Sequence, residues 1–97
     1  MSENTSQLMF DAEIAQNLRT NGQRALAYYF NMYQARLKAS LESTERVNRR
    51  FEKSDILQNT FIEATRLLPE YVDNPRVPLY IWLRQISRRM LQRALRF

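Results

Sequence analysis

The chain has 97 residues and a net charge of +5, which predicts a single basic domain with one modest core. It contains no Cys and no His, which excludes a disulfide framework, a thiolate site and an imidazole acting as metal ligand or general base. One Gly and three Pro favour long helices over a sheet joined by tight turns.

The first part of the chain predicts a tail followed by a short helix. Residues 1–9 are polar and are expected to form a flexible tail. A helix is expected over about 11–20, because Ile14 and Leu18 lie one helical turn apart. Gly22 tolerates the left-handed backbone that commonly ends a helix, so the helix is predicted to stop there.

Residues 23–42 predict a longer amphipathic helix. Apolar residues recur there at the threes and fours of one helix face. They are Leu26, Phe30, Tyr33, Leu37 and Leu41. Residues 43–53 lose this period and are interpreted as a connector.

The second half of the chain predicts two more helices. One begins at Ser54, a favourable N-cap residue, and ends just before Pro69, because a proline disfavours helical geometry in the residue that precedes it. Residues 69–78 contain all three prolines and are expected to form an ordered loop. The last helix is expected from Leu79 to the C-terminus.

Together these elements predict an all-α fold, a compact bundle of three main helices plus a short N-terminal helix. We expect one domain over residues 10–97. The predicted core contains Leu26, Phe30, Tyr33, Leu37, Ile56, Phe61, Ala64, Leu67, Leu83, Ile86 and Met90. The helical pattern still runs at Phe97 without a capping signal, so we expect the chain to be part of a longer protein.

The sequence contains no motif for catalysis. It has no Gly-rich phosphate loop, no metal-ligand cluster and no Ser/His or Cys/His pair, and its carboxylates are scattered. We therefore predict no enzymatic activity and no cofactor. No apolar run approaches the roughly 18 residues of a membrane span, and the N-terminus does not resemble a signal peptide. These features favour a cytoplasmic protein without a membrane partner.

The last predicted helix combines an apolar stripe with an arginine-rich arc. The arc holds Arg84, Arg88, Arg89, Arg93 and Arg96, and no acidic residue lies in residues 74–97. A guanidinium group suits phosphate, so this helix predicts contact with a nucleic-acid backbone. A solvated basic face and a membrane-surface helix are the alternatives.

Three aromatic residues precede or begin this helix. Tyr71, Tyr80 and Trp82 could stack on unpaired bases beside the arginines. Trp82 is equally compatible with a place in the core, whereas a position in the proline-bounded loop favours binding for Tyr71.

Ile62 lies on the polar side of its predicted helix. Its neighbours on that side are Asp55, Gln58, Asn59 and Arg66. An apolar residue rimmed by hydrogen-bonding groups is typical of a protein contact. Single exposed apolar residues are also common on surfaces without a partner.

The chain resembles region 2 of bacterial sigma factors of the sigma-70 family, especially the extracytoplasmic-function (ECF) group. One segment is SDILQNTFIEA, similar to the family's D-x-x-Q-E-x-F helix. The next is YIWLRQISRRML, similar to W-L-x-x-I-A-x-N at the family's spacing. Upstream, RALAYYFNMYQARLKASL looks like the first long helix of that domain. The sequence departs from the pattern at Asn59, where Glu is usual, and at Arg89, where Asn is usual.

The resemblance implies a domain with two partners. Core RNA polymerase would be bound through the clamp coiled coil of its largest subunit, by Asp55, Gln58, Asn59, Ile62 and Arg66. The non-template strand of the promoter −10 element would be bound by Tyr71, Asn74, Arg76, Tyr80, Trp82, Arg84, Arg88, Arg89 and Arg93. An anti-sigma factor is a further partner to consider, since family members are often held inactive by one. Complete members also carry a region 4 helix-turn-helix domain, which we do not expect within these 97 residues.

Two other functions fit the same sequence. One is a nonspecific nucleic-acid-binding helical domain, which has no need of the face around Ile62. The other is a protein-interaction module whose arginine helix docks on an acidic partner, which predicts no affinity for DNA.

Overall fold

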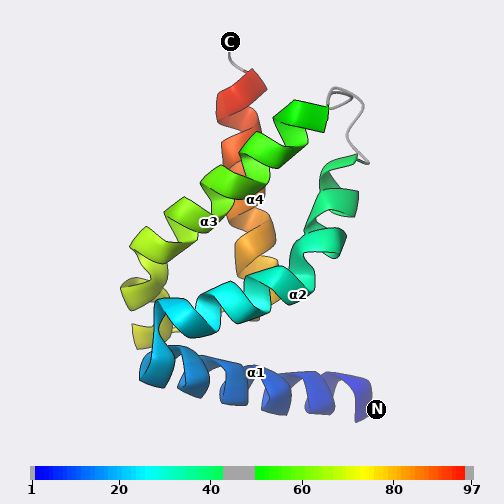
Figure 1. Cartoon of the computed structure of the whole chain (residues 1–97). Helices are drawn as coiled ribbons and strands as arrows, with labels where there is room; N and C mark the ends of the chain where they lie inside the picture. Colours follow the sequence, from blue (N-terminus) through cyan, green and yellow to red (C-terminus); the bar gives the residue numbers. More distant parts are fainter. Residues whose placement is uncertain (1, 43–49, 96–97) are drawn as a thin grey trace.

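The computed structural model describes residues 2–42 and 50–95, and within these ranges it contains four α-helices and no strand (Figure 1). Of residues 2–11, 42 and 50–52 it describes the backbone alone. The helices are α1 (Ser2–Asn21), α2 (Gln23–Glu42), α3 (Arg50–Asp73) and α4 (Leu79–Leu95). The all-α prediction is confirmed over the described ranges. The first part of the predicted connector, residues 43–49, and Arg96 lie outside them.

Helix α1 is longer than the sequence predicts. It begins at Ser2 instead of near residue 11, so residues 2–9 extend the helix where a tail was expected. These residues have no apolar period to signal a helix. Once a helix is nucleated, however, each added residue gains a backbone hydrogen bond whatever the pattern of its side chains.

Gly22 joins α1 to α2. Its φ of 56° lies in the left-handed region, as predicted for a residue that ends a helix. Its N–H donates to the carbonyl of Leu18 at 2.8 Å, and its carbonyl accepts from the N–H of Leu26 at 3.0 Å. One residue therefore ends one helix and begins the next.

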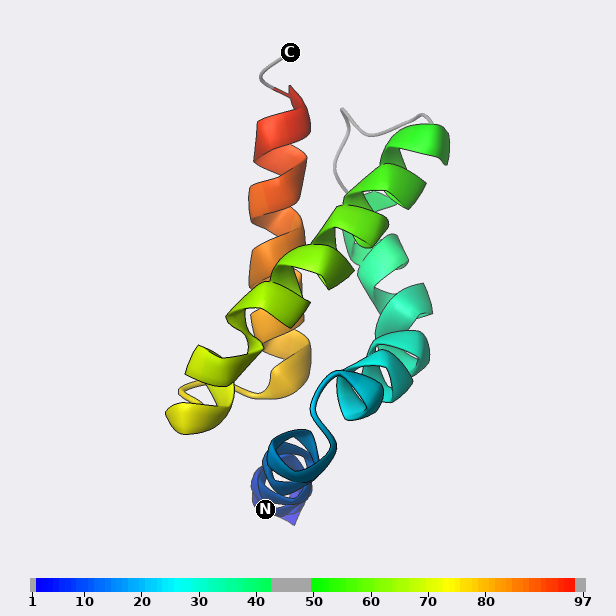
Figure 2. The same ribbon diagram turned by 60° about the vertical axis from the view of Figure 1, so that its left-hand side comes forward.

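Helix α2 has the predicted bounds and bends near its middle (Figures 1 and 2). Its first half lies over α1, and its second half runs beside α3 and α4. Aromatic pairs join the middle of α2 to α3 and to α4. The ring of Phe30 lies 5.3 Å from that of Phe61 on α3, and the ring of Tyr33 lies 5.4 Å from that of Tyr80 on α4.

Helix α3 extends beyond both predicted ends. The sequence predicts residues 54–68, and the helix runs from Arg50 to Asp73 with Pro69 inside it. The rule that a proline ends a helix fails here because the following turn packs Tyr71 into the core. That burial outweighs the single hydrogen bond lost at the proline. The predicted loop shrinks to the short segment between α3 and α4.

The core lies between the four helices of the described ranges, and Figure 2 shows α3 crossing α4. Of the eleven predicted core residues, eight are buried and three, Tyr33, Phe61 and Leu67, are partly buried. The predicted core omits several buried residues: Ile14, Leu18, Tyr29, Leu41, Leu57, Leu68, Tyr71, Leu79 and Leu91.

Candidate functional site

The outer face of α3 has Ile62 at its centre. The side chain is 60% exposed, whereas Ala64 is fully buried. The two residues are about 200° apart around the helix, so Ile62 points directly away from the core. The four polar residues predicted for the same contact are also exposed: Asp55, Gln58, Asn59 and Arg66. Helical spacing gathers all five within an arc of about 100°.

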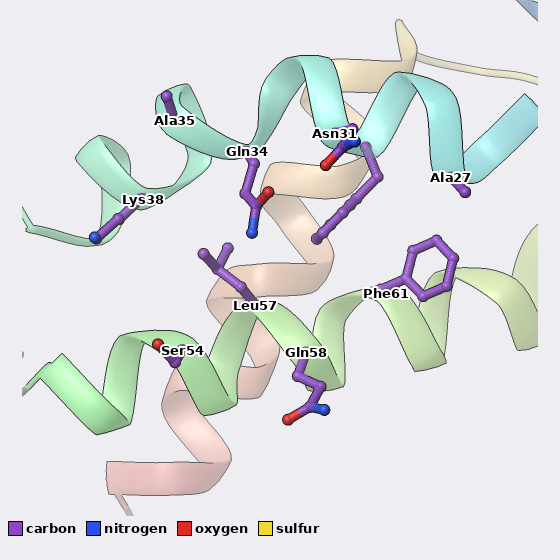
Figure 3. A pocket seen from close by; sticks show the side chains of 10 residues that line it. Ala27, Asn31, Gln34, Ala35, Lys38, Ser54, Leu57, Gln58 and Phe61 are labelled. Carbon is purple, nitrogen blue, oxygen red and sulfur yellow. The ribbon is translucent and has the colours of Figure 1, made fainter.

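A groove of about 840 Å³ lies beside this face, between α2 and α3 (Figure 3). Phe30, Leu57 and Phe61 are the large apolar residues of its lining. Gln34 of α2 and Leu57 of α3 point toward one another across it, while Gln58 points away from α2 toward the outer face. Gln58 thus connects the groove with the Ile62 face. The sequence does not reveal this groove, because its α2 side depends on how the two helices dock.

A second hollow, of about 600 Å³, lies where α3 ends and α4 begins. Five of the residues predicted to bind DNA line it: Tyr71, Asn74, Arg76, Trp82 and Arg89. Leu67, Glu70, Val77 and Gln85 complete the lining and were not predicted. Gln85 could have been found from its spacing, since it lies one turn from both Trp82 and Arg89. The hollow combines an aromatic wall with amide, carboxylate and guanidinium groups.

The prediction for Tyr71 is wrong. It was expected in the loop with its ring available to a ligand, and it is instead a core residue of α3. Its side chain is buried, and its ring stacks on that of Trp82 with centroids 4.3 Å apart. Its hydroxyl donates to the carbonyl of Val77 at 2.6 Å. Trp82 is half-buried and forms the outer layer of this stack. Of the two rings, Trp82 is therefore the one with more surface left for a ligand.

Tyr80 lies on the opposite flank of α4 from the hollow. It is half-buried against α2, where the guanidinium of Arg36 lies 4.1 Å from its ring centroid. Its hydroxyl donates to the carbonyl of Arg36 at 3.5 Å. The sequence analysis grouped Tyr80 with Trp82, but the structure separates them. The two side chains point to different sides of α4, because positions i and i+2 of a helix are about 200° apart.

The arginines of α4 form two pairs. Arg84 and Arg88 are four residues apart, as are Arg89 and Arg93, so each pair shares one flank. Arg84 is half-buried and the other three are exposed. Arg89 lines the hollow beside Trp82. The pair of Arg89 and Arg93 is the one on the flank that faces α3, since Arg89 shares the lining of the hollow with Leu67 and Glu70 of that helix.

Glu63 is an acidic residue of α3 on which the charges of Arg89 and Arg93 act. Its carboxylate accepts from Nε of Arg66 at 3.1 Å and from Nη2 of Arg66 at 2.7 Å. These hydrogen bonds lower the pKa of Glu63 below its ordinary value; desolvation opposes this, and the charges of Arg66, Arg93 and Arg89 add to the lowering. The carboxylate of Glu63 is therefore stabilised in its charged form by arginines of both α3 and α4.

Comparison with known proteins gives no relative: no protein-family model matches the chain, and no curated protein or solved structure matches it. Within residues 2–42 and 50–95, no helix has both the length and the apolar character needed to cross a membrane.

Proposed function

We propose that the chain is a region 2-type domain of a bacterial sigma factor of the ECF group. It binds core RNA polymerase through the outer face of α3, and it binds the non-template strand of the promoter −10 element through α4 and the hollow at its start. The domain catalyses no reaction itself, and a cytoplasmic site of action is part of the proposal.

The exposure of Ile62 is the observation that carries this proposal. An isoleucine that is 60% exposed and points away from the core adds nothing to the packing of the bundle. Its polar neighbours supply hydrogen-bonding groups around an apolar centre, the arrangement expected of a protein contact. The adjoining groove enlarges the surface available to a partner helix.

The hollow at the start of α4 supports the second contact. Proteins bind single strands by stacking bases on aromatic rings beside a positively charged track. Trp82 offers such a ring, and Arg89 lies in the same lining. The remaining arginines of α4 continue the positive charge along the helix, with no acidic residue in residues 74–97 to offset it.

A pull-down of core RNA polymerase tests the first contact. The Ile62→Asp variant should capture about tenfold less polymerase or worse, because it places a charge at the apolar centre of the contact. Met32→Asp is the matched control, since Met32 is an exposed apolar residue of α2 that does not line the groove. Equal capture by all three proteins would contradict the proposal.

Binding of labelled single-stranded DNA, measured by anisotropy at several salt concentrations, tests the second contact. Arg89→Ala should weaken binding and flatten its salt dependence, whereas Arg24→Ala, which removes the same charge from α2, should change little. DNA binding without polymerase capture would favour a nonspecific nucleic-acid-binding domain. Polymerase-independent binding to acidic proteins, without DNA affinity, would favour an interaction module.

A further inference from the structure

Arg66 is held on the α4 side of its helix and not toward Ile62. Two of its nitrogen atoms donate to the two carboxylate oxygens of Glu63, at 3.1 Å and 2.7 Å. Such a two-point contact fixes the plane of the guanidinium. The side chain of Arg66 remains 67% exposed, and that of Glu63 is only 15% exposed. The Arg66 guanidinium is therefore both oriented and accessible.

Two further arginines lie on the flank of α4 that faces this part of α3, where Arg89 shares the lining of the hollow with Leu67 and Glu70. Arg89 and Arg93 are one turn apart on α4, and both add to the positive potential at Glu63. Among the described side chains, neither has an ion-pair partner of its own within contact distance. Glu70 of α3 lies in the same region, since it shares the lining of the hollow with Arg89 and its charge acts on Arg66. Three guanidinium groups and two carboxylates therefore leave a net charge of about +1 at this junction of α3 and α4.

A surplus of positive charge with oriented donors is suited to a phosphate group. We infer that Arg66, Arg89 and Arg93 form a phosphate-binding site that spans α3 and α4, and that Glu63 acts as an internal anion competing for it. The inference rests on the proposed binding of nucleic acid along α4. It moves Arg66 from the polymerase contact to the nucleic-acid contact and makes Glu63 a residue that limits affinity.

The Glu63→Gln variant tests the site because it removes the charge and keeps the shape. It should bind a labelled single strand of about 12 nucleotides about two- to fivefold more tightly than the wild type, the effect expected of one exposed charge pair. Glu13→Gln, which removes an exposed carboxylate from α1, is the matched control and should leave affinity unchanged. In the Glu63→Gln/Arg66→Ala double variant the gain should disappear.

Elution from a heparin column separates this inference from the proposed function. Glu63→Gln should elute at higher salt than Glu13→Gln, and equal elution of the two would overturn the site. A shift on heparin without any wild-type affinity for single-stranded DNA would leave the phosphate site standing and remove the proposed function. Circular dichroism checks that each variant is folded. Glu63→Asp, which keeps the charge but withdraws the carboxylate, should give a smaller gain, and it decides the test if Glu63→Gln does not fold.

Discussion

Tyr71 and Trp82 stack across the junction of α3 and α4, with ring centroids 4.3 Å apart and ring planes 22° apart. The hydroxyl of Tyr71 also reaches the carbonyl of Val77 in the connecting segment. One buried side chain thus ties together the end of one helix, the start of the next and the loop between them. The wall of the hollow depends on this tie.

Replacing Tyr71 should therefore reduce the stability of the folded protein more directly than it reduces the binding of a ligand, because its ring is buried. Tyr71→Ala should lower the free energy of unfolding by about 3–5 kcal/mol, the usual cost of removing a buried aromatic ring. Tyr71→Phe should cost about 1 kcal/mol for the lost hydrogen bond. Urea unfolding followed by circular dichroism measures both. If Tyr71→Ala were as stable as the wild type, the ring would not belong to the core.

Arg36 should stabilise the contact between α2 and α4. Its guanidinium lies over the ring of Tyr80, so Arg36→Ala should lower the free energy of unfolding by about 0.5–1 kcal/mol. It should leave single-stranded DNA affinity where Arg24→Ala leaves it, because Tyr80 does not line the hollow. Thermal unfolding and anisotropy measure the two effects. A larger loss of DNA affinity with Arg36→Ala than with Arg24→Ala would return this flank to the nucleic-acid surface.

Pro69 should lower the free energy of unfolding without preventing the fold. It lies inside α3 and cannot donate to the carbonyl of Thr65, while the next turn continues to the hydrogen bond from the N–H of Asn74 to the carbonyl of Glu70 at 3.3 Å. Pro69→Ala restores the missing donor and should raise the free energy of unfolding by about 1–3 kcal/mol. Chemical denaturation tests this, and a loss of stability would show that the proline is needed to shape the end of the helix.

Glu63 should contribute stability that depends on pH. Its pKa in the folded protein is lowered from the ordinary value of 4.5, chiefly by the hydrogen bonds from Arg66. A lowered carboxyl pKa stabilises the folded state above the unfolded value and loses that effect as pH falls through the folded one. The difference in melting temperature between wild type and Glu63→Gln should therefore be constant near neutral pH and change below about pH 4.5. A difference that stays constant into acid would show that the ion pair has no net effect on folding.

The parts of the fold set by local chemistry could be predicted from the sequence. Gly22 marks the boundary between α1 and α2, and Pro78 precedes α4, where its carbonyl accepts from the N–H of Trp82 at 3.0 Å. The end of α3 could not be predicted in this way. The local effect of Pro69 is opposed by the packing of Tyr71 on a ring that lies eleven residues later in the chain, and only the folded structure brings those two rings together.

The candidate site was predictable to a similar extent. The exposure of Ile62 follows from helical periodicity alone and is confirmed. Periodicity does not say which flank of α4 meets α2, which is why Tyr80 was grouped with Trp82. Nor does it say that Arg66 turns toward Glu63, because both orientations fit the same position on the helix. Contacts between helices decide these cases.

Trp82 has a consequence for any experiment on this protein. It is the only tryptophan in the chain, and it is half-buried at the rim of the hollow. The emission of the native protein at long excitation wavelengths therefore comes from one position. A base stacked on Trp82 should quench its fluorescence, and replacing Tyr71, on which its ring stacks, should shift the wavelength of its emission maximum. The molecule thus carries a built-in optical reporter at the place where its proposed ligand would bind, and no dye or engineered label is needed to read it.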